Sequence, residues 1–213
     1  MTLLSKLLSF FPGVTFTLAI LSLSYGIWFH SLWGLILWVF FLYGFPVLIY
    51  RLHQRIYSLE PGISYLQGSD YSPWWGSHQL QLMYIAFPAL ETLLRLIPGV
   101  FSVWLRLWGA DVGKRVYWTS ALEIADRGLL SIGDDVVFGH RVGLYGHIIK
   151  PRRNNLMLYL KPITIGDGSF IGAGSYIGPG TTIAPGSFLE ADSKLYPNAT
   201  FNNVEDTKHA LVD

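Results

Sequence analysis

The sequence predicts a mainly β protein in which a parallel β-helix of six-residue repeats follows a transmembrane helical hairpin and interfacial helices. Three observations lead to this prediction. Residues 10–50 carry almost no charge, residues 80–109 are apolar but interrupted by charges and prolines, and residues 165–199 repeat with a period of six. The expected segments are a hairpin over 1–56, an interfacial loop and amphipathic helices over 57–110, the β-helix over 111–203 and a tail over 204–213.

The hairpin is predicted from the length of the uncharged stretch. Within residues 10–50, His30 is the only ionisable side chain other than tyrosine. About 20 apolar residues cross a bilayer, so this stretch suffices for two crossings with the tip at His30. We expect the spans near 11–29 and 32–50. A cleaved signal peptide followed by one span is the alternative, and the absence of a small-residue cleavage site disfavours it.

The distribution of basic residues predicts the orientation of the hairpin. Lys6 precedes the two spans and Arg51 and Arg55 follow them, whereas the tip carries no lysine or arginine. Because cytoplasmic flanks are enriched in these residues, both ends of the hairpin should face the cytoplasm. The sequence therefore predicts a two-span membrane protein whose β-helix is cytoplasmic.

The segment between the hairpin and the repeats is expected to lie at the membrane surface. Residues 57–76 are rich in Gly, Pro and Ser and predict a loop. Residues 80–109 are apolar but contain Glu91, Arg95 and Arg106. Those charges favour amphipathic helices in the interface over a third span, which is the alternative.

The repeat is the most informative feature of the sequence. Large apolar residues recur at Ile165, Ile171, Ile177, Ile183, Leu189 and Leu195. Three positions after each stands a residue type that tolerates a left-handed backbone: Gly168, Gly174, Gly180, Gly186, Asp192 and Asn198. This pattern is typical of short strands with one inward anchor, joined by tight corners. Three such sides close a triangular coil, and coils stack at about 4.8 Å.

An imperfect copy of the repeat runs upstream. Its anchors are Val112, Trp118 and Ile124 and, after a phase shift of two residues, Ile132, Phe138 and Leu144. With the later hexads, this copy predicts four to five coils.

These repeats resemble a known family. The run ITIGDGSFIGAGSYIGPGTTIAPGS is similar to the hexapeptide-repeat acyltransferases. The resemblance covers about residues 109–200 and implies a left-handed β-helix, a homotrimer and transfer of an acyl group. The upstream stretch LWGADVGKRVYWTSALEIADRGLLSIGDDVVFG is similar to a membrane-associated branch of the same superfamily.

The period fails between Leu144 and Ile165, where residues 148–162 form an excursion of 15 residues. Loops of this length in a compact domain are usually functional. His147 stands just before it in a Gly-His step. Maltose- and galactoside-type acetyltransferases have a similar step before a charged loop that ends in PITIG, with one residue more between them. That resemblance implies that His147 is the general base, a task that an imidazole titrating near neutrality suits.

Other residues are candidates for binding the donor. Three cations cluster at the start of the excursion: Lys150, Arg152 and Arg153. They could meet the phosphates of coenzyme A or of a lipid-linked acceptor, or only touch anionic headgroups. Members of the family that this chain resembles bind the acyl donor in a groove between subunits. Two positions in the wall of that groove align with Ala173 and Ala191. Phe170 falls where relatives often keep a tryptophan.

Together with the resemblance, these residues predict an acyltransferase with acyl-CoA or acyl carrier protein as co-substrate and no bound cofactor or metal. Its acceptor would be lipidic or tethered to the membrane. With no cysteine, direct transfer is simpler than a covalent intermediate. Fifteen basic against fourteen acidic residues give no field to attract nucleic acid.

Several alternatives stay open at this stage. His147 could merely cap a corner, and His140 is the competing base. A zinc-dependent carbonic anhydrase shares this fold but needs three histidines. A non-enzymatic membrane-bound scaffold trimer fits the repeat equally well.

Overall fold

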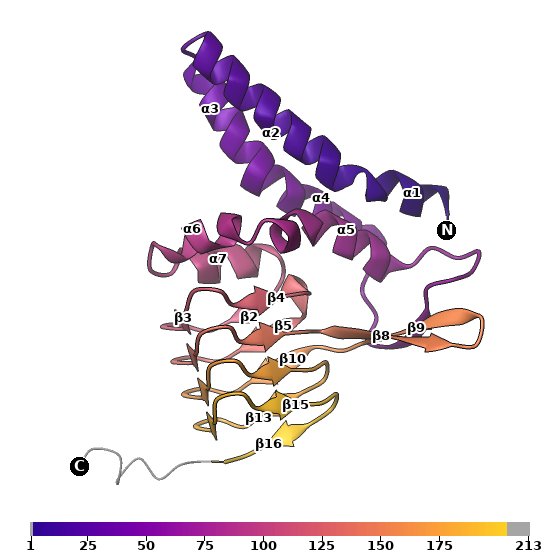
Figure 1. Ribbon diagram of the computed structural model, residues 1–213, viewed down its shortest axis with the longest axis vertical. Helices are drawn as coiled ribbons and strands as arrows, with labels where there is room; N and C mark the ends of the chain where they lie inside the picture. The colour runs from indigo at the N-terminus through magenta and orange to yellow at the C-terminus, as the bar shows by residue number, and fades with distance from the viewer. Residues whose placement is uncertain (1, 204–213) are drawn as a thin grey trace. The chain divides into compact units, whose positions relative to one another are not determined.

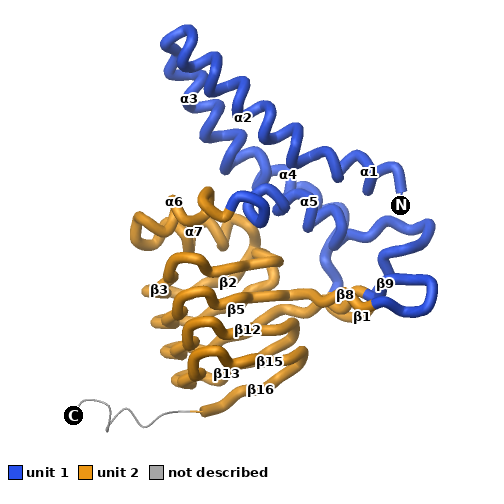
Figure 2. Tube along the Cα trace, viewed as in Figure 1, with its two compact units in different colours: residues 1–60, 64–87, 151–157 blue, residues 61–63, 88–150, 158–213 orange. Residues whose placement is uncertain are grey.

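The computed structural model describes residues 2–203 and divides into two compact units (Figure 2). Residues 1–60, 64–87 and 151–157 belong to the first unit, and the remainder belongs to the second. The first unit holds the N-terminal helices, and the second holds the stacked coils of the β-helix (Figure 1). The predicted tail, 204–213, lies outside the described residues.

Two long helices make up most of the first unit. The first comprises α1 (Leu3–Ser9) and α2 (Phe11–Trp28), and the second comprises α3 (Leu32–Val39), a π-helical turn η1 (Phe40–Gly44) and α4 (Phe45–Ile56). Both are long and apolar enough to cross a membrane. His30, with φ 49°, forms the tip between them, at the position predicted from the sequence.

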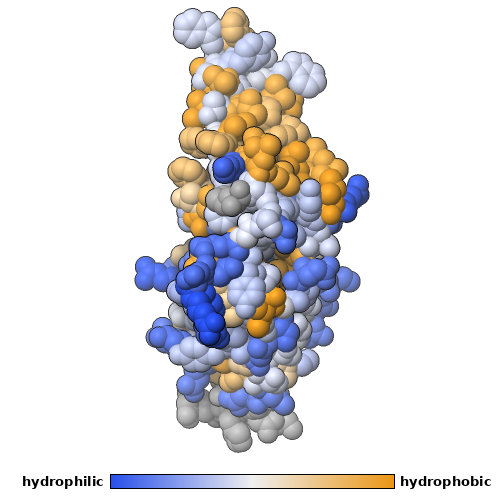
Figure 3. Space-filling model, turned by 90° about the vertical axis from the view of Figure 1, so that its right-hand side faces the viewer, coloured by the Kyte–Doolittle hydropathy of each residue, from blue (hydrophilic) through white to orange (hydrophobic). Residues whose placement is uncertain are grey.

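The two long helices pack through small residues. The buried positions of α2 are Thr15, Ala19, Ser22 and Gly26. A Cβ atom on Gly34 would lie 2.4 Å from the Cα atom of Gly26, so only glycine permits this approach. Close contact between small residues is typical of helix pairs in membranes, where large apolar side chains face lipid. Hydrophobic residues accordingly gather on the outside of the hairpin (Figure 3).

The segment that follows the hairpin differs in detail from the sequence prediction. The expected loop over 57–76 contains strand β1 (Gly62–Tyr65) and the start of helix α5 (Pro73–Ala86). Ser72 caps this helix by accepting a hydrogen bond from the backbone N–H of Trp75 at 3.4 Å. Proline at the first turn suits a helix start, which explains the misplaced boundary.

Two short helices of the second unit come next, α6 (Ala89–Arg95) and α7 (Val100–Leu107). Gly99, with φ 81°, separates them. No third helix in residues 2–203 has the length and hydropathy of a span. The charges that favoured interfacial helices are bonded within the protein: the side chain of Glu91 is buried, and those of Arg95 and Arg106 donate to backbone carbonyls.

Three parallel sheets form the faces of the β-helix. The first face contains β2 (Asp111–Val112), β5 (Leu130–Ile132), β10 (Ile163–Ile165), β13 (Thr182–Ile183) and β16 (Thr200–Phe201). The second face contains β3 (Tyr117–Trp118), β6 (Val137–Phe138), β11 (Phe170–Ile171) and β14 (Phe188–Leu189). The third face contains β4 (Glu123–Ile124), β7 (Gly143–Leu144), β12 (Tyr176–Ile177) and β15 (Lys194–Leu195). These strands give four coils and a final strand, as the repeat predicted.

The register confirms the predicted period. Ile165 pairs with Ile183, so one regular coil takes eighteen residues and the anchors stack inside. The first coil is longer, because Val112 pairs with Ile132, and a short 3-10 helix η2 (Arg127–Leu129) lies within it. Every predicted corner residue has a positive φ: Gly168, Gly174, Gly180, Gly186, Asp192 and Asn198. These features fit the left-handed β-helix expected from the resemblance.

The excursion over 148–162 is a β-hairpin rather than the irregular loop predicted. Its strands are β8 (His147–Arg152) and β9 (Asn155–Leu160), and β1 completes a sheet of order β1-β9-β8. Arg153, with φ 47°, forms the turn. Leu158 and Leu160 are buried at alternate positions of β9, a period of two that indicates a strand. The sequence prediction rested on the six-residue period alone and therefore missed this alternation.

Candidate functional site

His147 lies at the corner between the third and first faces, where it is the first residue of β8 and is separated from the end of β7 by Tyr145 and Gly146. Its ring atom Nδ1 lies 2.6 Å from Oδ2 of Asp126. The Asp126 residue is only 2% exposed, whereas the His147 side chain is 17% exposed. A buried carboxylate therefore supports a histidine that still reaches the surface.

The pairing follows from the register of the coils. Ile124 of β4 pairs with Leu144 of β7, and this register brings Asp126 beside Gly146 on the next coil. A Cβ atom on Gly146 would lie 3.1 Å from Oδ2 of Asp126. Glycine thus makes room for the carboxylate, which explains why the histidine stands in a Gly-His step.

This geometry defines what the histidine can do. When Nδ1–H donates to a carboxylate, the hydrogen is fixed on Nδ1 and the lone pair is on Nε2. The carboxylate also stabilises the imidazolium that forms once Nε2 has taken a proton. A histidine held in this tautomer can accept a proton at Nε2.

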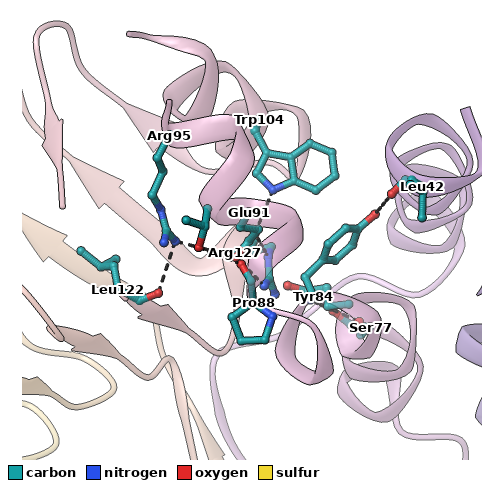
Figure 4. Close-up of polar contacts among 11 residues, drawn as sticks. Leu42, Ser77, Tyr84, Pro88, Glu91, Arg95, Trp104, Leu122 and Arg127 are labelled. Atoms are coloured by element: carbon teal, nitrogen blue, oxygen red, sulfur yellow. Dashed lines mark hydrogen bonds and ion pairs between the residues drawn. The ribbon is translucent and has the colours of Figure 1, made fainter. Parts of the chain in front are cut away.

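A buried ion pair holds the turn that carries Asp126 (Figure 4). Arg127 donates from Nε to Oε1 of Glu91 at 2.6 Å and from Nη2 to Oε2 at 3.0 Å. Trp104 of α7 donates from Nε1 to the same Oε1 at 2.8 Å. Helices α6 and α7 therefore fix η2, and with it the residue that precedes η2.

Two tyrosines and a glutamate lie on the outer side of the third face. The hydroxyl of Tyr145 donates to Oε2 of Glu123 at 2.9 Å, and its ring stacks on Tyr176 with centroids 4.7 Å apart. Burial, together with the Glu123 carboxylate, raises the pKa of Tyr145 above its ordinary value. Burial likewise raises the pKa of Tyr176. Both rings therefore stay neutral near pH 7 and offer aromatic faces.

A groove of about 500 Å³ opens one residue beyond His147. Its lining residues come from β8, the third face and the corner that follows it: Ile148, Ile149, Lys150, Tyr176, Lys194, Tyr196 and Pro197. It combines two lysines with apolar and aromatic side chains and has no carboxylate among its lining residues. Such a groove can bind an anionic ligand that carries an apolar or aromatic part.

The predicted cations are therefore only partly brought together. Lys150 lines the groove, where Lys194 is the second cation. Arg152 and Arg153 lie exposed at the end of β8 and at the turn, and neither lines the groove.

The two predicted donor-wall residues lie at another corner. Ala173 and Ala191 are exposed between the second and third faces, stacked so that the N–H of Asp192 donates to the carbonyl of Ala173. His140 precedes them in the same column, since Gly174 N–H donates to its carbonyl. Within one chain, the wall residues thus share a corner with His140 and not with His147.

His140 has a weaker partner than His147. Its Nδ1 lies 3.4 Å from the hydroxyl of Ser120, at an exposed position. Phe170, the other predicted position, is partly exposed and stacks on Phe188 with ring centroids 5.0 Å apart. No group of three or more His, Asp or Glu side chains within residues 2–203 could hold a metal ion.

Sequence reasoning missed Asp126, Lys194 and Glu91. Asp126 could have been found by aligning the first two coils with the phase shift, because it then falls opposite Gly146. Lys194 occupies an outward strand position, which a repeat does not mark as functional. Nothing in the sequence signals that Glu91 is buried, because charged residues in apolar helices also occur at interfaces.

Comparisons with known proteins agree with the repeat. Residues 162–192 match the family model described as hexapeptide repeat of succinyl-transferase. No curated protein matches the chain. Among solved structures, a hexapeptide-repeat acetyltransferase from Vibrio cholerae, complexed with acetyl coenzyme A, has 17% identity and a TM-score of 0.48, covering 66% of this chain and 87% of that one.

Two further solved structures are similar in part. A maltose O-acetyltransferase from Clostridium difficile 630 has 21% identity and a TM-score of 0.41, covering 53% of this chain and 77% of that one. A serine acetyltransferase from Entamoeba histolytica, in complex with cysteine, has 13% identity and a TM-score of 0.37, covering 92% and 70% respectively.

Proposed function

We propose that this chain, whose residues 162–192 match a hexapeptide-repeat family model, is an acyltransferase that moves an acyl group from a cytoplasmic thioester to a membrane-associated acceptor. The donor is acyl-CoA or an acyl carrier protein, and the acceptor offers a hydroxyl or an amine. The 2.6 Å contact between His147 and the buried Asp126 carries the proposal, because it pairs a surface histidine with a group that orients it.

In the proposed reaction, Nε2 of His147 takes the proton from the acceptor as its oxygen or nitrogen attacks the thioester carbonyl. The tetrahedral intermediate then collapses, the carbon–sulfur bond breaks, and the thiolate leaves. The imidazolium returns its proton to the thiolate, so the products are the acylated acceptor and the free thiol. Asp126 accepts the Nδ1 hydrogen bond throughout and stabilises the charged ring.

The groove beside His147 is proposed to bind the anionic part of one substrate. Lys150 and Lys194 provide cations for phosphate, and the ring of Tyr176 provides an aromatic face. Arg152 and Arg153 are proposed to extend this field along β8. A diphosphate-linked lipid acceptor and coenzyme A share this chemistry, and competition between the two for the groove would separate them.

The homotrimer is part of the proposal for a geometric reason. Ala173 and Ala191, proposed to flank the donor, lie at a different corner from His147 in the same chain. A site that contains both therefore needs the corner of a second copy. Light scattering of the detergent-solubilised protein should give a trimer, and an active monomer would contradict this arrangement.

The membrane-bound acceptor is proposed because two helices, Leu3–Trp28 and Leu32–Ile56, are long and apolar enough to cross a bilayer. A soluble acceptor would gain nothing from an enzyme held at the membrane. Lys6, Arg51 and Arg55 favour a cytoplasmic catalytic domain. A reporter fused after Asp213 should be active in the cytoplasm, and periplasmic or luminal activity would reverse this topology.

The decisive experiment compares two histidine variants in isolated membranes supplied with acyl-labelled coenzyme A or acyl carrier protein. His147→Asn should lower transfer of label to membrane material by about 10²–10⁴-fold, the usual contribution of a general base. His140→Asn is the matched control and should remain active. The reverse result would assign the base to His140. Full activity in both variants would assign proton transfer to another residue, and no transfer by the wild type from either donor would favour the scaffold trimer.

A further inference from the structure

A second groove, of about 750 Å³, lies beside the short helices α6 and α7 of the second unit. It is formed by the turn between α6 and α7, by α7 itself and by residues 113–118, which join the first and second faces. Four of its lining residues are basic, namely Arg95, Arg106, Lys114 and Arg115, and none is acidic. Arg115 is ion-paired with Asp135 and Arg95 lies 4.0 Å from Glu91, so Arg106 and Lys114 supply the remaining positive charge. This corner is not the one that carries His147, so the groove is separate from the acyl-transfer site.

Arg95 gives the groove a buried polar group with an unused donor. Its side chain is 5% exposed, and its Nη2 donates to the carbonyl of Leu122 at 3.2 Å (Figure 4). The guanidinium carbon lies 4.2 Å from the centre of the Phe101 ring. Its Nε–H is buried and has no acceptor within residues 2–203. Because an unsatisfied buried donor is unfavourable, an acceptor oxygen delivered by a ligand would be stabilised there.

The remaining walls of the groove are apolar. Ile97, Val103 and Tyr117 line it and are more than half exposed, and Phe101 lies buried beneath them. Further exposed aliphatic side chains lie outside the groove, Leu93 on α6, Leu96 just after it and Leu107 on α7. Exposed apolar side chains that gather on one segment can mark an interaction site.

We propose that this groove binds one anionic phospholipid from the bilayer. The acyl chain would lie along Ile97 and Val103, a phosphate or ester oxygen would accept from Arg95 Nε, and exposed Lys114 would face the headgroup. Charge complementarity selects an anionic amphiphile, and the two helices able to cross a membrane make the bilayer its source. The proposal goes beyond acyl transfer and does not depend on it.

The test uses the full-length protein in nanodiscs of phosphatidylglycerol or of phosphatidylcholine with the same acyl chains, followed by gentle release and native mass spectrometry. The wild type should retain one phosphatidylglycerol per chain and less phosphatidylcholine. Ile97→Asp should weaken retention at least about tenfold, because a carboxylate in an apolar groove is poorly solvated and repels the headgroup. Lys114→Gln should weaken it less.

Lys161→Gln is the matched control, because it removes an exposed cation outside the groove. It should leave lipid retention unchanged. All three variants replace exposed side chains, so their melting curves should match that of the wild type. Equal retention of the two lipids, or equal retention by Ile97→Asp and the wild type, would overturn the proposal. Loss of oligomer without loss of lipid in Ile97→Asp would instead show that a second copy covers the groove.

Discussion

The buried ion pair between Glu91 and Arg127 gives a prediction that can be worked out from the structure. Glu91→Gln removes a charge whose carboxylate accepts three hydrogen bonds, two from Arg127 and one from Trp104. Both side chains of the ion pair are at most 5% exposed, so the variant leaves a guanidinium buried without its counter-ion. Breaking a buried pair in this way costs about 3–5 kcal/mol. For a chain of this size, that corresponds to a fall in Tm of about 6–20 °C.

The exposed ion pair between Arg115 and Asp135 supplies a matched control. It has the same 2.6 Å separation, but its side chains are 66% and 50% exposed. Asp135→Asn makes the same chemical change as Glu91→Gln, and solvent screens the loss. Circular dichroism melting of the detergent-purified protein should therefore show a large shift for Glu91→Gln and none outside error for Asp135→Asn. Equal shifts would refute the argument that burial of the pair decides its contribution.

Three further predictions concern packing and titration. Gly34→Ala should destabilise the helical hairpin by about 1–3 kcal/mol, because the added Cβ would meet the backbone of Gly26. Gly13→Ala adds a Cβ in open space and should not destabilise it, and thermal unfolding in detergent would measure both variants. Ile177→Ala should lower the free energy of unfolding by about 2–5 kcal/mol, because the buried side chain of Ile177 stacks between Leu144 and Leu195 of the neighbouring coils. Denaturant titration would measure the loss. Burial, helped by Tyr57, raises the pKa of Tyr71 to about 12, so the contribution of Tyr71 to folding stability should be constant below pH 10 and fall as pH rises toward 12. An ultraviolet titration in which Tyr71→Phe lost no late-ionising phenol would contradict this.

The repeat could be predicted from the sequence because each of its positions has one physical requirement. An inward anchor such as Ile171 must be large and apolar, and a corner such as Asn198 must tolerate a positive φ. These requirements recur every six residues and do not depend on distant contacts. The hairpin tip at His30 was equally local, because His30 is the only ionisable side chain other than tyrosine within residues 10–50.

Features that depend on long-range contacts could not be predicted in the same way. The Asp126–His147 pair joins residues on neighbouring coils, and its existence depends on the two-residue shift in register. The burial of Glu91 depends on Arg127, which the repeat marks only as part of an irregular corner. The strands of the excursion were missed because the end of the six-residue period does not exclude a period of two residues, which is the one that β9 follows.

The measurement that tests the central claim most directly is a double-mutant cycle on acyl transfer. Asp126→Asn should lower turnover by up to about 10⁴-fold, as expected when the group that fixes the tautomer of a catalytic histidine is lost. His147→Asn should also abolish most activity, and the double variant should be no slower than the slower single variant, because the two residues act as one unit. If the two losses multiplied in the double variant, or if Asp126→Asn kept the wild-type rate with unchanged melting, the proposed dyad would be contradicted.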